Sequence, residues 1–93
     1  MTDSGTSAAS RAAALAKALD HLTAREWQLA HAIVQEDKST LAAWMHGIVH
    51  TIEGDLDNAR HWYRRAERAF PGAGAIDQEI AAARLAFRQE HLA

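Results

Sequence analysis

The chain has 93 residues, no cysteine and a formal net charge of −2 at neutral pH. This length suits one small domain, and the absence of cysteine excludes disulfides and thiolate metal sites. The charge balance gives no global field for nucleic acid or an anionic membrane, and no apolar run reaches the ~18 residues of a membrane span. We therefore expect a cytoplasmic protein with neither nucleic acid nor membrane as a partner.

Helix signals run almost continuously along the chain after a short polar start. Residues 1–7 lack the basic start and apolar stretch of a signal peptide, and we interpret them as a disordered lead. Residues 8–93 are predicted to form a single all-helical domain. Its first helix is expected to begin at Ser7 or Ser10 and to end at His21, with apolar residues at helical spacing.

A capping box predicts the start of the second helix. Thr23 and Glu26 have the spacing that satisfies two free backbone N–H groups, and Leu22 and Trp27 have the spacing of a hydrophobic staple. We expect this helix to end near Glu36.

Two further helices are expected on either side of a two-residue break. The third is predicted from Thr40 to Glu53, after a short polar turn that supplies its N-cap. Gly54 suits the left-handed residue that ends a helix, and Asp55 suits the cap of the next one. The fourth helix is expected to end near Ala69.

The chain is predicted to be all-α, with about five short antiparallel helices. After Pro71, which opens a break, a last helix is expected from about Ala75 to His91. Its acidic residues lie near the start and its basic residues near the end, as the helix dipole favours. No segment shows the pattern of a strand.

Residues 40–70 resemble one helical hairpin of the tetratricopeptide-repeat family. The resemblance is carried by small residues and turn residues in the register of that family: Gly47, Gly54, Asp55, Ala59, Tyr63, Ala66 and Pro71. Trp44 departs from the pattern by one position, and His50 takes the place of a tyrosine. Stacked repeats need about three copies for stability, and one clear copy is present here. The resemblance implies a helical hairpin enclosed by flanking helices.

The stretch from Trp27 to Ala66 also resembles small bacterial proteins of unknown function. The shared string is Trp-x-His, then His-x-x-Glu-Gly-Asp, Asn-Ala and Trp-Tyr-x-Arg-Ala. This second resemblance supports the fold and implies no chemistry.

The tetratricopeptide family normally presents a groove that binds peptides or partner helices. The resemblance therefore implies a noncatalytic interaction or scaffold module, with a protein partner or with self-association as a homodimer. Trp27 and Trp44, expected to be partly exposed, and the basic edge residues Arg60 and Arg64 are the candidate partner-binding residues. A thin core would gain stability from such a partner. This interpretation favours a protein that is not an enzyme and holds no cofactor.

Six histidines in the chain offer an alternative, a metal-binding helical protein with hydrolysis as a candidate activity. His46, His50 and Glu53 stand at i, i+4 and i+7, along one strip of the third helix, and His31 could approach from the second. Such residues suit zinc or another divalent transition metal. The competing interpretation is structural, with the imidazoles packed against the fourth helix and bonded to Glu53, Tyr63 or the backbone.

Overall fold

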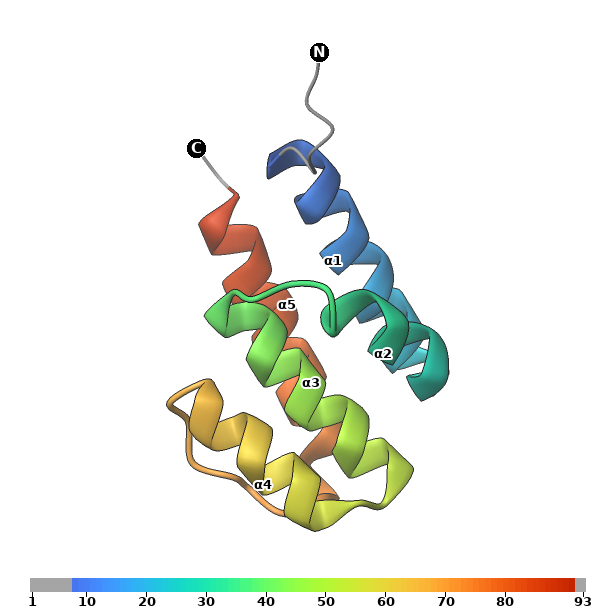
Figure 1. Ribbon diagram of the computed structural model, residues 1–93, viewed down its shortest axis with the longest axis vertical. Helices are drawn as coiled ribbons and strands as arrows, with labels where there is room; N and C mark the ends of the chain where they lie inside the picture. The colour runs from blue at the N-terminus through green and yellow to red at the C-terminus, as the bar shows by residue number, and fades with distance from the viewer. Residues whose placement is uncertain (1–7, 92–93) are drawn as a thin grey trace.

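The computed structural model describes residues 8–91, which form five α-helices and one short 3₁₀ helix (Figure 1). The elements are α1 (Ala8–Thr23), α2 (Trp27–Val34), α3 (Thr40–Glu53), α4 (Leu56–Arg65), the 3₁₀ helix η1 (Ala73–Ala75) and α5 (Ile76–Glu90). These residues include no strand, so the predicted all-α class is confirmed. Within the same range, no helix has the length and apolar character needed to cross a membrane. The predicted lead at residues 1–7 lies outside the described range.

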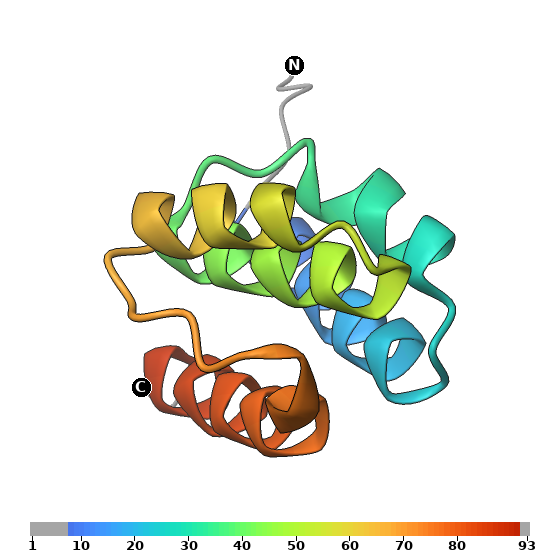
Figure 2. The same cartoon turned by 90° about the horizontal axis from the view of Figure 1, so that it is seen from below.

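Helix α3 lies at the centre of the molecule and contacts all four other α-helices (Figure 1 and Figure 2). Every residue from Leu41 to Thr51 is buried, so about three turns of α3 are covered on all sides. A helix that is covered all round forms the core of a domain. The surrounding helices supply the other large buried side chains, which are Leu15, Leu19, Leu22, Val34, Tyr63 and Ile80.

Three of the helices end in the same hydrogen-bonded motif, which places one residue in the left-handed conformation. At the end of α3 this residue is Gly54, as predicted, and the N–H of Asp55 donates to the carbonyl of His50 at 3.0 Å. At the ends of α1 and α4 the left-handed residues are Arg25 and Glu67, with φ of 64° and 61°. In each motif the N–H group of the following residue donates back into the helix.

The predicted capping box at the start of α2 is wrong. Thr23 belongs to the last turn of α1, where its hydroxyl donates to the carbonyl of Leu19 at 3.0 Å. Helix α2 begins at Trp27, and its N-cap residue Glu26 makes no side-chain capping bond. The carboxylate of Glu26 instead lies 2.8 Å from Nδ1 of His21. Helix α2 is therefore a short element of eight residues without a side-chain cap.

The other helix boundaries follow the predictions at their starts, whereas three ends differ, and α1 ends at Thr23, two residues after the predicted His21. Helix α3 spans the predicted range Thr40–Glu53. Helix α4 begins after the predicted cap Asp55 but ends at Arg65 instead of near Ala69, because the left-handed Glu67 turns the chain out of the helix. Helix α2 ends two residues before its predicted end.

Gly47 allows α3 to pack closely on α4. A Cβ atom at this position would lie 2.5 Å from Cδ1 of Tyr63 and 3.4 Å from the carbonyl oxygen of Ala59. The first distance is far below the ~3.5–4.0 Å at which carbon atoms attract each other. The close helical crossing that the hairpin pattern predicted therefore forms at these residues.

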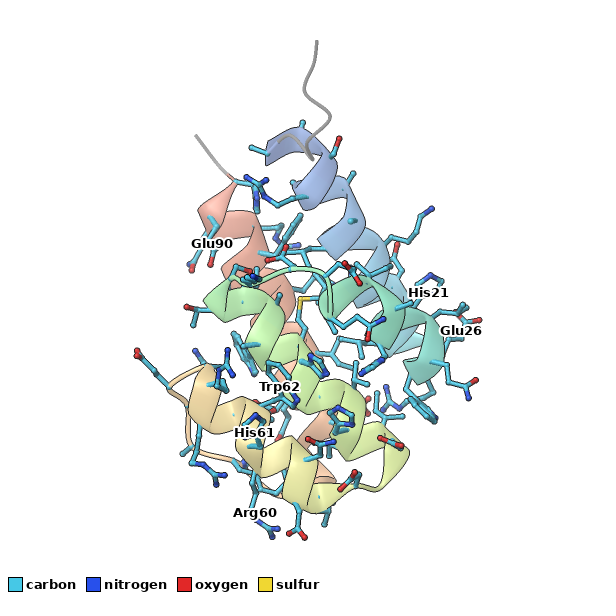
Figure 3. The ribbon with its side chains drawn as sticks, viewed as in Figure 1. His21, Glu26, Arg60, His61, Trp62 and Glu90 are labelled. Carbon is cyan, nitrogen blue, oxygen red and sulfur yellow. The ribbon has the colours of Figure 1, made fainter. Side chains whose placement is uncertain are left out.

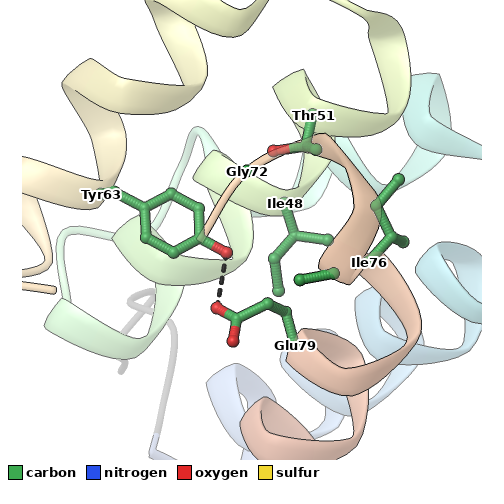
Figure 4. Close-up of a pocket in the computed structure, with 7 residues that line it drawn as sticks. Ile48, Thr51, Tyr63, Gly72, Ile76 and Glu79 are labelled. Atoms are coloured by element: carbon green, nitrogen blue, oxygen red, sulfur yellow. Dashed lines mark hydrogen bonds between the residues drawn. The ribbon is translucent and has the colours of Figure 1, made fainter. Parts of the chain in front are cut away.

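A polar cluster of Trp44, Tyr63 and Glu79 joins α5 to the α3–α4 hairpin, and Figure 4 shows the bond between Tyr63 and Glu79. Oε1 of Glu79 accepts hydrogen bonds from the Tyr63 hydroxyl at 2.7 Å and from Nε1 of Trp44 at 2.9 Å. Burial and the bond to Glu79 raise the pKa of Tyr63 well above its usual value, so it remains a neutral donor. The gap between Tyr63, Glu79 and Ile48 is too narrow for a water molecule. The cluster is a packing contact, with no room for a ligand.

Candidate metal centre

Three histidine side chains meet between α2 and α3. His46 and His50 lie one turn apart on α3, and His31 reaches them from α2. The ring centroid of His31 lies 4.8 Å from that of His46 and 5.3 Å from that of His50, and the two rings on α3 are 4.9 Å apart. One ligand nitrogen from each ring can be chosen so that all three lie within 4.8 Å of one another. His31, predicted as an extra ligand from a neighbouring helix, therefore joins the pair.

The local fold explains why these three rings meet. The i, i+4 spacing places His46 and His50 on one side of α3. On α2, Ala30 and Val34 are buried and belong to the core cluster, so the face of α2 that carries them packs inward. His31 lies beside Ala30 and one turn before Val34, on or next to that face. Packing of α2 on α3 thus brings the third imidazole to the other two.

The histidine cluster is largely removed from solvent. His46 and His50 are 5% and 7% exposed, and His31 is half-buried. Within residues 8–91, the side chains of His46 and His31 make no hydrogen bond. Buried polar groups in folded proteins almost always have a hydrogen-bond partner, so an unpaired buried imidazole requires an explanation.

Electrostatics keep His46 neutral at physiological pH. Burial, together with the nearby imidazoles of His50, His31 and His61, lowers the pKa of His46 from 6.5 to about 4. A neutral imidazole carries the nitrogen lone pair that a metal ion requires. His46 can therefore bind a cation near pH 7 without first releasing a proton.

Glu53 bonds to the ring of His50. Its Oε1 lies 2.7 Å from Nδ1 of His50, and the two side chains are 33% and 9% exposed, respectively. In the tautomer that donates Nδ1–H to this carboxylate, Nε2 of His50 carries the free lone pair. Metal-bound histidines commonly bond to a carboxylate through their other ring nitrogen in this way.

The predicted strip of His46, His50 and Glu53 does not form one group of ligand atoms within 4.8 Å of one another. Among the described residues, the group formed around His46 contains three imidazoles and no carboxylate. Glu53 belongs to a second group with His50 and Asp55, whose ligand atoms also lie within 4.8 Å of one another. Asp55 already caps α4, where it accepts the N–H of Asn58 at 3.3 Å. Glu53 is thus placed to orient His50.

Trp62 of α4 covers one face of His46. The two rings are stacked, with centroids 3.8 Å apart and planes 6° apart. The neighbouring residue His61 is exposed and meets the edge of Trp62 at 5.3 Å; both are labelled in Figure 3. Stacking covers the face of an imidazole, whereas its nitrogen lone pairs lie in the ring plane. Trp62 therefore shields His46 from water without blocking its nitrogens.

The contact with Trp62 was not predicted from the sequence. The signal in the sequence that could have predicted this contact is the hairpin register, which places His46 where the third helix meets the fourth.

The residues predicted to bind a partner lie in different environments. Trp44 is 3% exposed, so the expectation that it lies partly exposed is wrong: its indole is buried and donates to Glu79 of α5. Trp27 is half-buried, and Arg60 and Arg64 are exposed on α4. Arg60 pairs with Asp57 at 3.3 Å, as expected for a solvated helix face. Partner binding by Trp27, Arg60 and Arg64 stays a prediction.

Comparisons of the chain with protein-family models, curated protein sequences and solved structures found no match. The comparisons therefore assign no family, and the part of the tetratricopeptide resemblance that the structure supports is the all-helical architecture.

Proposed function

We propose that this protein binds a divalent transition-metal ion through His31, His46 and His50. The observation that supports this proposal is the convergence of three imidazoles from two helices, two of them buried, with ligand nitrogens within 4.8 Å of one another. Imidazole nitrogen suits zinc, copper, iron and nickel. A bound ion would also supply the partner that the nitrogens of His46 lack among the described residues.

The site fits such an ion after a small movement. Zinc–nitrogen bonds of about 2.0–2.1 Å in a tetrahedral site place the ligand nitrogens about 3.3 Å apart. The nitrogens of the cluster, which lie within 4.8 Å of one another, would move closer by at most about 1.5 Å. Rotation of the half-buried ring of His31 can supply much of this change. Three protein ligands leave a fourth position, which a water molecule occupies in zinc sites of this kind.

Metal content tests the proposal directly. Elemental mass spectrometry of untagged protein purified without chelator is expected to find about one transition-metal ion per chain. His31→Ala should lose the metal, and this half-buried position can be truncated with little effect on the core. His91→Ala is the matched control, because His91 is exposed near the end of α5 and contacts Phe87 instead of the cluster.

Stabilisation by added zinc gives a second test of the site, and one of its outcomes would refute the proposal. At a free concentration of one hundred times its dissociation constant, zinc should stabilise the wild-type chain by about 2.7 kcal/mol. If zinc stabilises His31→Ala as much as the wild type, the proposed site is wrong.

A second candidate function, a noncatalytic interaction module, is supported by a different surface. Leu29 is 52% exposed on α2, and with the half-buried Trp27 it lines a surface hollow of about 220 Å³. The close crossing at Gly47 also agrees with a tetratricopeptide-like hairpin, a family that binds partners. Native mass spectrometry is expected to show a dimer for the wild type and a monomer for Leu29→Glu. A monomeric wild type at high concentration would contradict self-association.

A further inference from the structure

A groove of about 370 Å³ lies beside the histidine cluster, between the α2–α3 loop and α4. Val34 and Ala43 in its lining lie one helical turn from His31 and His46, respectively. Trp62, which stacks on His46, lines the groove as well. The volume is at the lower end of the range of about 300–1,000 Å³ that small-molecule pockets occupy.

Part of the groove is apolar and fixed by the core. Val34 is 1% exposed and Ala43 is 9% exposed, so both side chains are held in place by packing. Trp62 is half-buried and is held against His46 by the stacking of the two rings. Of these three side chains, Trp62 is the one that offers apolar surface to a ligand, and the other two hold the wall of the groove in place.

The rest of the lining carries two cationic side chains, Lys38 and Arg65. Within residues 8–91, neither forms an ion pair, and the guanidinium of Arg65 lies 5.3 Å from the ring centroid of Trp62. Asp37 contributes the one carboxylate of the lining, and it accepts the backbone N–H of Ser39 at 2.8 Å. The groove therefore combines an apolar surface with an excess of positive charge.

We propose that this groove binds a small organic carboxylate. The apolar body of the ligand would contact the part of Trp62 that lines the groove, and its carboxylate would pair with Lys38 and Arg65. Arginine is suited to this role because its planar guanidinium can donate two parallel hydrogen bonds to one carboxylate. The site goes beyond the proposed metal binding and does not depend on it, since its cations and apolar residues are separate from the three histidines.

Benzoate titrated into the full chain tests this site, with binding followed by calorimetry and by NMR shifts. The protein is first freed of metal with a chelator, because a bound metal ion could itself take a carboxylate. We expect Lys38→Ala/Arg65→Ala to bind benzoate about tenfold more weakly or worse than the wild type. Both side chains are exposed, so the double variant should keep its helicity.

Two controls isolate the role of charge in the groove. Lys17→Ala/Arg88→Ala removes the same charge from exposed positions on α1 and α5 and should bind benzoate like the wild type. Benzamide has the same ring without the charge and should bind at least about tenfold more weakly than benzoate. Equal binding of benzoate and benzamide, equal binding by the wild type and Lys38→Ala/Arg65→Ala, or no benzoate binding at all would overturn the proposal.

The two proposals fail separately. Metal-free protein that binds benzoate through Lys38 and Arg65, but takes up no zinc, would refute the metal centre and keep the groove. Protein that binds zinc through the histidines, but no benzoate when metal-free, would refute the groove and keep the metal centre.

Discussion

Helix α3 buries polar side chains on two sides, and the two sides differ in how those groups are paired. Toward α5, the carboxylate of Glu79 accepts hydrogen bonds from both Trp44 and Tyr63. Toward α2, the rings of His31 and His46 make no hydrogen bond within residues 8–91. Buried polar groups with partners specify a fold, whereas local departures from good pairing are expected at functional sites. This difference supports our proposal that the α2 side of α3 carries the function.

Glu79→Leu should have the largest effect on stability. It leaves the indole N–H of Trp44 and the hydroxyl of Tyr63 buried without an acceptor, and each such group costs about 1–3 kcal/mol. We expect a loss of about 3 kcal/mol in the free energy of unfolding, measured by chemical denaturation. Glu90→Leu, at an exposed position of α5, is the control. A loss no greater than that of the control would mean that this cluster does not hold α5 in place.

Acidification should destabilise the metal-free protein because of His46, which lies on the α2 side of α3. The pKa of His46 is about 4 in the folded chain and 6.5 without the protein environment. Between these values the unfolded chain binds the proton and the folded chain does not. Stability is therefore highest above pH 6.5 and falls as the pH drops toward 4, by about 3 kcal/mol from this residue.

Chemical denaturation at pH 7 and pH 4 measures this loss, and His46→Phe should lose most of it. The same pH dependence in both proteins would show that another group is responsible.

Glu53 allows a matched comparison with Glu79, because each carboxylate accepts from a buried side chain of α3. Glu53 is partly exposed and contacts His50 alone among the histidines. Glu53→Gln should change the metal-free stability by less than about 1 kcal/mol. The same change should weaken zinc binding about tenfold, because an amide is a poorer acceptor for the ring N–H that orients His50. Zinc competition with a chromophoric chelator measures the affinity, and an unchanged value would exclude this orienting role.

His46→Phe should have the smallest effect on the fold and still remove the metal site. Phenylalanine keeps a ring against Trp62 and eliminates two nitrogens that lack partners in the described structure. At pH 7 the metal-free variant should therefore stay within about 1 kcal/mol of the wild type or exceed it. Denaturation and zinc titration of the same preparation provide both readouts. A destabilisation as large as that of Glu79→Leu would make His46 a structural residue.

Much of the fold could be predicted because local signals marked the helix boundaries. Gly54 and Asp55 gave the end of α3 and the start of α4, since glycine tolerates the left-handed conformation and aspartate caps free N–H groups. The errors fell at Arg25 and Glu67, whose residue types do not favour positive φ. Tertiary packing imposes those conformations, so sequence alone could not locate the two helix ends.

The candidate site was predicted in part for a similar reason. Helical spacing alone placed His46 and His50 on one side of α3. The meeting with His31 depends on how α2 packs, so the sequence could offer it only as a candidate. The contact of Trp62 with His46 and the approach of Arg65 to the α2–α3 loop depend in the same way on the course of α4. Helical spacing also placed Glu53 in one strip with both histidines, whereas its carboxylate bonds to His50 alone of the pair.

The shortness of α2 has a consequence for how the molecule opens. A helix of eight residues without a side-chain cap has little stability of its own, so its amides should exchange with solvent early in the metal-free protein. In a chain without cysteine, an ion shared by His31, His46 and His50 would serve as a cross-link that closes the loop between α2 and α3. Zinc should therefore slow hydrogen exchange in α2 far more than in α5.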